Sequence, residues 1–391
     1  MKTCLYITYD GLLDPLGQSQ ILPYIKNLNK NGYGFIIISY EKIRNKEKIK
    51  DLKKDLKNSG IHWKPFIFRK RKINFLYRFI IGAIYINYIQ LKRRIDLIHL
   101  RGGYPGLIYL ISFSKKKYLY DLRAFWGQWA EGGRTEKNSI IYKILLKLER
   151  KIINNAAAIV VLDKSGKYFI NKNFNYVKPL KVISTSTDIK KYLIKSKSKN
   201  HFIKFVYLGG ASYPPYKIKN ALILLNGLAK IGYKCRLDFI NKSEHKLIKD
   251  ILKKEKSNNI VINILSLSHQ DIFDTLPNYD IGLIFLEKGE WLRMSSPTKI
   301  GEYLAAGLGI IGNKGIAVLD RLSKESNCVE TIEIDSHNFQ IRDHKLHKFL
   351  LYKNRINFRK ECQKLAEKHY SLKQANKKYL SIYRKILDKD L

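Results

Sequence analysis

The sequence has few cysteines, and they do not form a recognisable pattern. Cys4, Cys235, Cys328 and Cys362 are scattered along the chain without a CxxC pair. Neither a disulfide framework nor a structural zinc site is therefore supported, and a reducing compartment is expected. No Asp-x-Asp metal motif lies at the end of a predicted strand, so we expect neither a metal ion nor another cofactor.

An export signal and a long apolar run are also missing. Residues 1–10 predict a strand, because they carry a single lysine, end in Tyr9 and Asp10, and are not followed by a small-residue cleavage site. The apolar stretch from Phe75 to Leu91 is too short and too interrupted to predict a membrane span. We therefore expect a cytoplasmic protein.

Acidic residues are scarce compared with basic ones. The chain holds 74 Lys and Arg against 33 Asp and Glu, a formal net charge of +41. Such a charge attracts nucleic acids, anionic membranes and nucleotides alike. Part of the excess fits an AT-rich coding sequence, which enriches Lys, Ile, Asn and Tyr together. No RNA-binding aromatic motif, helix-turn-helix pattern or Cys/His finger is visible, so sequence-specific nucleic-acid binding is not expected.

What the chain does contain is two successive series of alternating strands and helices. Its 391 residues are enough to form two separate hydrophobic cores. This pattern predicts an α/β protein with two Rossmann-like, doubly wound domains. A polar linker, Lys195–Asn200, separates the two series. The predicted strands are residues 4–9, 35–40, 97–100, 118–121, 158–162 and 181–183 before the linker, and 202–208, 235–240, 260–264, 281–286 and 309–311 after it.

One segment combines a predicted anion-binding site with a carboxylate. Ser295–Thr298 precedes an apolar run from Ile300 to Ala306, which predicts a helix whose first N–H groups are free to bind an anion. Glu302 lies one turn into this helix, where its carboxylate can accept two hydrogen bonds from a ribose diol. Gly307 is expected to end the helix. The segment therefore favours a nucleotide over a bare anion.

This segment resembles the donor site of the retaining glycosyltransferases of family 4. The resemblance implies the GT-B fold, in which two Rossmann-like domains face each other across a cleft. In that family two glutamates frame the nucleotide-sugar: the second falls on Glu302, whereas Met294 occupies the position of the first. That departure leaves the ribose role of Glu302 intact and the sugar contact unassigned. The resemblance also implies domains at residues 1–193 and 194–357, and a helical segment at 358–391 that crosses back to the first.

Two glycine loops match the family at other points. Gly17 follows the first strand and would approach the donor phosphates or the acceptor, the alternative being a plain βα turn. Gly209 and Gly210 follow the first strand of the second domain; Gly210 replaces the Arg of many relatives, and Lys217 matches their Lys. Lys217 would grip the diphosphate, unless it is an ordinary surface lysine. Lys219 or Lys299 could supply the missing cation.

Polar residues end two strands of the first domain, where they are expected to point into the cleft. Asp121 and Arg123 stand where many relatives have a histidine that contacts the sugar, and we predict both as catalytic or acceptor-side residues. The alternative is a structural ion pair. Arg101, at the end of the preceding strand, is a second acceptor-side candidate, whereas His99 is expected to be structural.

The Phe75–Leu91 stretch is bracketed by two basic clusters, Arg69–Lys72 and Lys92–Arg94. Such flanks suit an amphipathic helix lying on an anionic membrane, and a core helix of the first domain is the equal alternative. A lipid-linked acceptor would explain both the apolar surface and the charge.

The sequence thus predicts a hexosyltransferase of cell-surface polysaccharide synthesis. It would move a sugar, with retention, from a nucleoside diphosphate sugar to a glycan or lipid-linked acceptor at the inner face of the membrane. The alternatives are a nucleotide-sugar epimerase or phosphorylase on the same fold, and a non-catalytic polyanion-binding protein. The predicted donor-site residues are Gly17, Gly209, Gly210, Lys217, Ser295, Ser296, Pro297, Thr298, Lys299 and Glu302.

Overall fold

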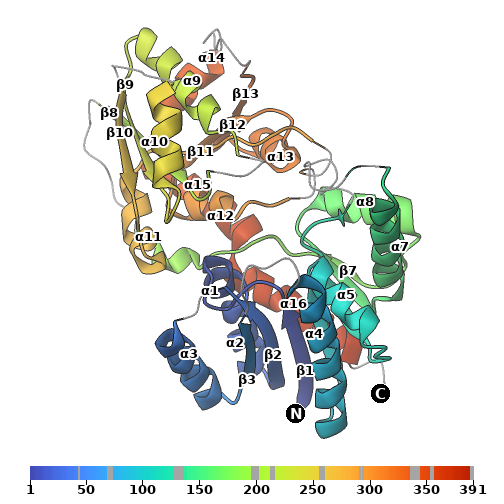
Figure 1. The fold of residues 1–391 in the computed structure, drawn as a ribbon. Coiled ribbons are helices and arrows are strands. Elements are labelled where there is room, and N and C mark those ends of the chain that lie inside the picture. Colours follow the sequence, from blue (N-terminus) through green and yellow to red (C-terminus); the bar gives the residue numbers. More distant parts are fainter. Residues whose placement is uncertain are drawn as a thin grey trace. The chain divides into compact units, whose positions relative to one another are not determined.

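The computed structural model describes most of the chain as two compact units. The described residues are 1–42, 45–67, 74–126, 136, 138–194, 202–211, 216–254, 260–289, 292, 295–334, 344–352 and 356–387. Unit 1 comprises Met1–Ser184 and Leu372–Leu391, and unit 2 comprises Thr185–Ser371 (Figure 1).

Unit 1 is built on a parallel sheet. Among its described residues seven strands pair in the order β3-β2-β1-β4-β5-β6-β7. The order reverses direction at β1, as in doubly wound folds, so the carboxyl ends of β1 and β4 flank a switch point. The strands are β1 (Lys2–Thr8), β2 (Tyr33–Glu41), β3 (His62–Ile67), β4 (Leu97–Arg101), β5 (Tyr118–Asp121), β6 (Ala158–Val161) and β7 (Leu180–Val182).

Helices cover this sheet in two layers. The side chains of α2 and α16 share one apolar cluster with β1 and β2, and α4, α5 and α7 pack side by side in a second layer. Close packing in that layer depends on glycine, since a Cβ on Gly106 of α5 would meet Ile152 of α7 at 2.7 Å. The helices are α1 (Pro15–Gln20), α2 (Leu22–Lys30), α3 (Lys46–Asn58), α4 (Asn74–Lys92), α5 (Gly103–Ile111), α7 (Ile140–Asn155), α8 (Lys164–Phe174) and α16 (Leu372–Leu387).

Unit 2 repeats the plan. Its described residues form a six-stranded parallel sheet in the order β10-β9-β8-β11-β12-β13. The strands are β8 (Phe202–Leu208), β9 (Lys234–Ile240), β10 (Ile260–Leu265), β11 (Ile281–Ile284), β12 (Gly309–Asn313) and β13 (Val329–Ile332). The helices are α9 (Ile218–Lys230), α10 (His245–Lys254), α11 (His269–Thr275), α12 (Thr298–Ala305), α13 (Ala317–Glu325), α14 (His344–Tyr352) and α15 (Ile356–Tyr370), with short 3-10 turns at η1 (Ile189–Lys191) and η2 (Leu276–Asn278).

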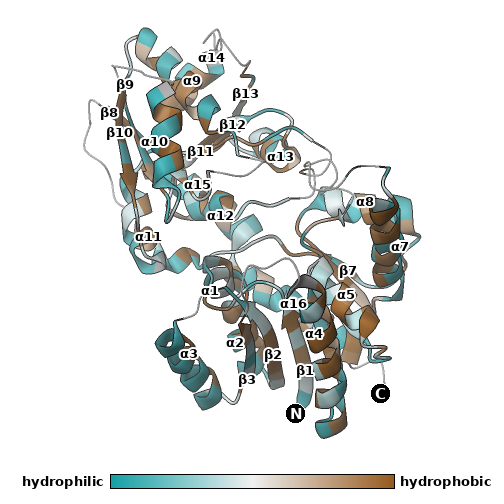
Figure 2. Ribbon diagram, in the orientation of Figure 1, coloured by the Kyte–Doolittle hydropathy of each residue, from teal (hydrophilic) through white to brown (hydrophobic). Residues whose placement is uncertain are grey.

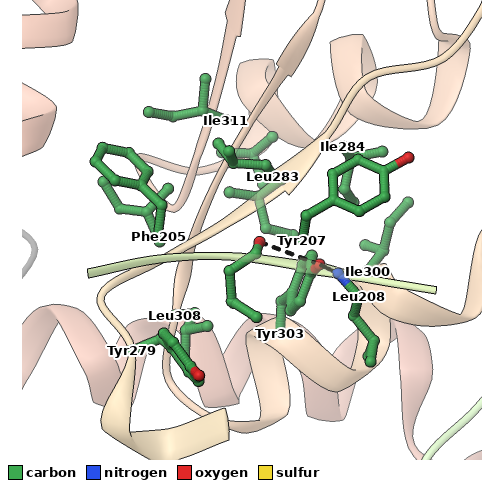
Figure 3. Packing of buried hydrophobic residues seen from close by; sticks show 14 of the residues in the cluster. Phe205, Tyr207, Leu208, Tyr279, Leu283, Ile284, Ile300, Tyr303, Leu308 and Ile311 are labelled. Atoms are coloured by element: carbon green, nitrogen blue, oxygen red, sulfur yellow. Dashed lines mark hydrogen bonds between the residues drawn. The ribbon is translucent and has the colours of Figure 1, made fainter. Parts of the chain in front are cut away.

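The core of unit 2 is centred on the contact between α12 and its sheet. Figure 3 shows Tyr303 of α12 among Phe205, Leu283 and Ile311, with its hydroxyl bonded to the backbone of Leu208. Leu208 N donates to that hydroxyl at 2.7 Å. The ring lies so close to β11 that a Cβ on Gly282 would meet it at 2.2 Å. Tyr303 therefore fixes the position of α12 relative to the end of β8.

The predicted fold class is confirmed: both units are parallel, doubly wound sheets covered by helices. Two strands were not predicted, β3 and β13, and both are edge strands. β3 contains Pro65, which lacks an amide donor and is tolerated at an edge, so its sequence does not resemble a central strand. The predicted end of α12 is also confirmed, since Gly307 adopts a positive φ of 73° directly after it.

The contacts divide the chain at slightly different points from those predicted at 193/194 and 357/358. The units change at Ser184/Thr185 and at Ser371/Leu372, so α15 belongs to unit 2 and only α16 returns to unit 1. Arg359 explains why α15 stays. Its buried guanidinium donates to the carbonyls of Pro277, Tyr279 and Ala306, which fastens α15 beside α12.

The apolar stretch predicted at Phe75–Leu91 is helix α4, which packs into the core of unit 1 along one face, as the core-helix alternative expected, while its contact with a membrane stays a prediction. Phe79, Ala83, Ile86 and Ile89 are buried, whereas Leu76, Tyr77, Ile80, Ile84, Tyr88 and Leu91 are exposed. In Figure 2, α4 and α5 are largely brown while α3 is largely teal. Within the described part of the chain, no helix combines the length and apolarity that a membrane crossing requires. The basic cluster at Arg69–Lys72 lies outside the described residues.

Candidate functional site

The predicted donor residues of unit 2 meet at the carboxyl edge of its sheet. β8 ends at Leu208 and is followed by Gly209, whose φ of 107° is strained for any residue with a side chain. The Lys299 side chain, from the first turn of α12, lies over this turn: a Cβ on Gly209 would be 3.7 Å from its Nζ. The structure thus brings the glycine turn and the start of α12 together.

Lys299 is buried in an unusual way. It is only 6% exposed, and its Nζ has no hydrogen-bond partner among the residues that the structure describes. The ammonium group is 4.4 Å from the ring centroid of Tyr207 and 4.8 Å from that of Tyr216. Aromatic faces attract a cation but satisfy none of its three N–H donors. Lys299 is therefore held in place while its donors remain available to an anion.

Glu302 is one turn further along α12 and is coupled to Lys299. Desolvation raises the pKa of Glu302 to about 7, although Lys299 opposes this shift. Desolvation likewise lowers the pKa of Lys299 to about 7, although Glu302 opposes it. Both groups therefore change charge near neutral pH, as is typical of functional sites. A ligand that bears negative charge beside Lys299 would favour its ammonium form.

A polar network that the sequence did not reveal fixes the glycine turn. Asn241, just beyond the end of β9, donates from its side-chain amide to the carbonyl of Gly209 and to Glu244, both at 2.9 Å. Glu244 in turn accepts a hydrogen bond of 2.6 Å from the backbone N–H of Ala211. The only sequence signal is the position of Asn241 after a strand. The Gly209–Ala211 backbone is thus rigid before any ligand binds.

The residues before α12 are used partly to build the loop. Ser295 Oγ donates to the carbonyl of Leu292 at 2.9 Å, which closes a turn. Thr185 Oγ1 donates to the carbonyl of Ser296 at 2.8 Å and lies 3.3 Å from its hydroxyl. Pro297 caps the helix, and Thr298 is its first residue. The anion-binding site predicted here therefore consists of the helix N-terminus and Lys299, with the two serines holding the loop. Met294 lies outside the described residues.

Lys217 has a different environment from Lys299. Its Nζ forms an ion pair of 3.2 Å with Glu287, and both side chains are more than a third exposed, at 48% and 39%. Its neighbour Tyr216 is one of the two rings against Lys299. Gly210 lies beside the same ring, since a Cβ there would meet Tyr216 at 3.1 Å. The role predicted for Lys217 remains a prediction, and its contacts are those of a surface ion pair.

The predicted residues of unit 1 form a separate cluster around Asp121. This carboxylate is fully buried at the end of β5 and accepts hydrogen bonds from Arg123, from Arg101 at 3.3 Å and from the Tyr379 hydroxyl at 3.1 Å. Arg101 ends β4 and also lies 3.6 Å from Asp10. Arg123 and Asp121 thus form the ion pair that was the alternative to a catalytic role. Their site role remains a prediction, and Asp121 has the contacts of a counter-ion.

The surroundings of Asp121 and His99 determine the protonation states of both groups. Burial by itself would raise the pKa of Asp121, but Arg123, His99 and Arg101 hold it below its ordinary value. Desolvation lowers the pKa of His99, whose Nδ1 lies 2.8 Å from the Tyr383 hydroxyl. Asp121 is therefore ionised and His99 neutral at pH 7.

The guanidinium groups are not fully used by Asp121. Arg123 has two buried nitrogens, Nε and Nη1, without a hydrogen-bond partner among the described residues, and Arg101 Nε also lacks one. Tyr379 and Tyr383, both from α16, were missed by the sequence analysis because they lie more than 250 residues from the strands they contact. Of these three nitrogens, Arg101 Nε is the one that lies 3.6 Å from Asp10.

Gly17 has a packing role. It is buried inside α1, and a Cβ there would lie 2.1 Å from the carbonyl oxygen of Gly11. The Gly11–Leu13 loop is held by a buried carboxylate that the sequence did not reveal: Glu41 accepts from Leu12 N at 2.7 Å and from Leu13 N at 3.3 Å. The absence of a side chain at Gly17 thus lets α1 pack on its own loop, and its predicted approach to a ligand remains untested.

No group of three or more His, Cys, Asp or Glu is placed to hold a metal ion among the described residues. No protein-family model and no curated protein sequence matches the chain.

Solved structures do match the chain along its whole length. Sucrose-phosphate synthase from Thermosynechococcus elongatus superposes with a TM-score of 0.67 at 10% identity, covering 100% of both chains. A glycosyltransferase from Rickettsia africae ESF-5 gives a TM-score of 0.66 at 17% identity, covering 99% of this chain and 98% of that one. The trehalose-6-phosphate synthase from E. coli, bound with UDP-2-fluoro glucose, gives 0.65 at 9% identity, with coverage of 97% and 98%.

These similarities establish the fold. The two units, each with a parallel Rossmann-like sheet, have the GT-B architecture of glycosyltransferases. At identities of 9 to 17% the superpositions carry over no residue roles, so the chemistry must be argued from this chain's own side chains.

Proposed function

We propose that this protein is a retaining glycosyltransferase of family 4 that uses a nucleoside diphosphate sugar. The observation that carries the proposal is Lys299: a buried ammonium, without hydrogen-bond partners among the described residues, at the N-terminus of α12 and one turn from the Glu302 carboxylate. A helix N-terminus, a cation and a carboxylate at the carboxyl edge of a doubly wound sheet suit the diphosphate and ribose of a nucleotide.

Each group has a distinct task in this proposal. Lys299 and the first N–H groups of α12 bind the diphosphate and stabilise its charge as the glycosidic bond breaks. Glu302 accepts hydrogen bonds from the ribose hydroxyls. Because the site is desolvated, one well-placed ammonium contributes far more than it would in water. Lys299 thus takes the place of the arginine that Gly210 replaces.

The acceptor side is proposed at the end of β4 and β5 in unit 1. Arg123 and Arg101 have buried donors that Asp121 does not use, so they suit an acceptor that carries negative charge. Sucrose-phosphate synthase and trehalose-6-phosphate synthase are both named for phosphorylated sugars, which is consistent with such an acceptor.

Retention of configuration and a location at the membrane are further parts of the proposal. A structure of trehalose-6-phosphate synthase that concerns glycosyl transfer with retention superposes at a TM-score of 0.61, which supports retention. The net charge of +41 and the exposed apolar side chains of unit 1, among them Phe113 and Val177, support a peripheral location at the inner face of the membrane and a glycan or lipid-linked acceptor, as in polysaccharide synthesis.

Calorimetry with nucleoside diphosphates and a screen of nucleotide-sugars for hydrolysis test the proposal. We expect one diphosphate to bind, and Lys299→Met to weaken that binding while Lys217→Met preserves it. A protein that binds DNA in a salt-sensitive manner but no nucleotide would instead be the polyanion-binding alternative.

A further inference from the structure

The amino edge of the unit 1 sheet has an unusual surface. Three of the connections that lead from a helix into a strand at this edge expose an apolar side chain: Leu91 before β4 is 86% exposed, Phe113 before β5 is 86% exposed and Val177 before β7 is 95% exposed. Each is followed within three residues by lysine or arginine. Because β4 to β7 are adjacent in the sheet, these connections lie in one row.

Two of these connections contact each other directly. Ser114 Oγ, next to Phe113, donates to the Gln90 side chain at the end of α4, at 2.9 Å. Phe113 itself has a φ of 55°, the left-handed region that a bulky residue rarely adopts. The carboxyl ends of α4 and α5 are therefore in direct contact, with Leu91 and Phe113 exposed beside that contact.

Between Phe113 and Val177 the surface is hollowed into a basic pocket of about 790 Å³. Its floor contains Tyr109 and Tyr118, whose ring centroids are 4.5 Å apart. No acidic side chain is among the described residues that line it. The lining includes six lysines from four connections and helices: Lys115, Lys116, Lys117, Lys151, Lys178 and Lys385.

The combination of charge and exposed apolar tips indicates the kind of partner. Lysines around a pocket attract phosphate, and a soluble polyanion would need nothing more. Exposed Phe and Val side chains at the tips of loops gain nothing from a soluble polyanion, but they are stabilised in the acyl boundary of a bilayer. Basic residues beside apolar ones match the anionic headgroups and interior of a membrane surface.

We propose that this protein binds an anionic phospholipid bilayer through the amino edge of the unit 1 sheet, with a lipid phosphate in the Phe113–Val177 pocket. The inference rests on the membrane location proposed above and is independent of the donor chemistry. It differs from binding through the length of α4. β4 has five residues and is therefore about 17 Å long. Arg101, at its carboxyl end, lies about that distance from the edge that would contact the bilayer.

Flotation of the full-length protein with vesicles tests this surface. Vesicles of phosphatidylcholine with phosphatidylglycerol should bind the protein, and phosphatidylcholine alone should not. Replacing Lys116, Lys151, Lys178 and Lys385 with Gln should weaken binding about a hundredfold, because each lysine near an anionic surface contributes separately. The matched control replaces Lys242, Lys246, Lys249 and Lys253, exposed lysines in and before α10 of unit 2. It removes the same charge and should change binding less than threefold.

A second pair of variants separates the edge from the α4 face. Phe113→Ser with Val177→Ser should lower vesicle binding about tenfold, whereas Ile80→Ser with Ile84→Ser, at exposed sites in the middle of α4, should leave it unchanged. All four sites are at least half exposed, so circular dichroism and nucleotide affinity should stay those of the wild type.

Equal losses from the two lysine sets would overturn the proposal, since they would show that only net charge matters. A larger loss from the α4 pair than from the Phe113 and Val177 pair would overturn it in favour of α4. It would also fail if the wild type did not bind anionic vesicles, or if the lysine set lowered DNA binding as strongly as vesicle binding. Calorimetry with a nucleoside diphosphate on the same samples tests the proposed function separately.

Discussion

The buried charged clusters of the two units are balanced in opposite ways. In unit 1, Asp121 is surrounded by Arg101, Arg123 and His99, and its interactions with these three side chains keep it ionised. In unit 2, Lys299 and Glu302 have only each other as charged partners among the causes of their pKa shifts, and both pKa values lie at about 7. The first cluster holds a fixed arrangement of charge, whereas the second can respond to a ligand.

The difference follows from how many opposite charges and hydrogen bonds surround each buried charged group. Burying a charge is unfavourable unless opposite charges and hydrogen bonds compensate for it. Asp121 receives three such bonds, and its cluster is a structural element that also orients two arginines. Lys299 faces two aromatic rings, which compensate only in part. We therefore expect substitutions in the first cluster to change stability and those in the second to change ligand binding.

The largest expected effect is on stability, from Asp121→Asn. Removing this carboxylate takes the buried Arg123 guanidinium away from its counter-ion and leaves Arg101 with Asp10 at 3.6 Å, which should destabilise unit 1 by about 3–5 kcal/mol. Hydrogen exchange of the α16 and β5 amides should report the loss. Asp55→Asn is the control. The Lys26–Asp55 ion pair is also short, at 2.7 Å between Nζ and Oδ2, but both of its side chains are exposed. It should cost at most about 1 kcal/mol. Similar costs for both would mean that the buried cluster is not structural.

Lys299→Met should lower turnover about ten- to a thousandfold without changing stability by a similar amount, since it removes the cation from the diphosphate. Lys217→Met should lower it less than threefold, because Lys217 is exposed and already paired with Glu287. Initial rates with a nucleotide-sugar found in the screen provide the measurement. A larger loss from Lys217 than from Lys299 would reverse the assignment.

Glu302→Gln should weaken nucleoside diphosphate binding by about 1–3 kcal/mol, the contribution of charge-assisted hydrogen bonds to ribose. Titration calorimetry measures it, with Glu367→Gln, an exposed carboxylate of α15, as the control. Unchanged affinity in Glu302→Gln would remove this residue from the site.

The pH dependence of nucleotide-sugar binding should be bell-shaped with its maximum near pH 7. Above pH 7 Lys299 loses its proton and the diphosphate loses its cation; below pH 7 Glu302 gains a proton and no longer accepts two hydrogen bonds. Each limb should approach about tenfold per pH unit. A nucleotide-sugar is the right probe, because its phosphates do not titrate over this range. Lys299→Met should flatten the alkaline limb and Glu302→Gln the acid limb, and a limb that survived its substitution would contradict the assignment.

Much of the fold and part of the site could be predicted from the sequence. Central strands such as β1, β8 and β12 are apolar runs bounded by turn residues, and α12 has both a start signal and Gly307 at its end. The edge strands β3 and β13 were missed because both are interrupted by polar or charged residues and β3 also contains Pro65. The structure brings Gly209 and Lys299 together, since the carboxyl ends of parallel strands and the helices that follow them share one edge, while their role as donor-site residues stays a prediction.

What the sequence could not predict are the partners from distant parts of the chain. Tyr379 and Tyr383 reach β4 and β5 only because α16 packs on unit 1, and Glu41 and Asn241 brace loops through hydrogen bonds with no sequence signature. Our proposal of Lys299 rather than Lys217 as the diphosphate-binding cation also rests on burial, which local sequence does not show.

By itself, the sequence determined the doubly wound architecture, the positions of the glycine turns and the identity of the charged residues, because these depend on local periodicity, backbone conformation and composition. Only the tertiary structure decided which charges are neutralised and which remain available. That outcome depends on how far each group is removed from water and on what then lies within hydrogen-bond distance, and both are properties of residues brought together by packing.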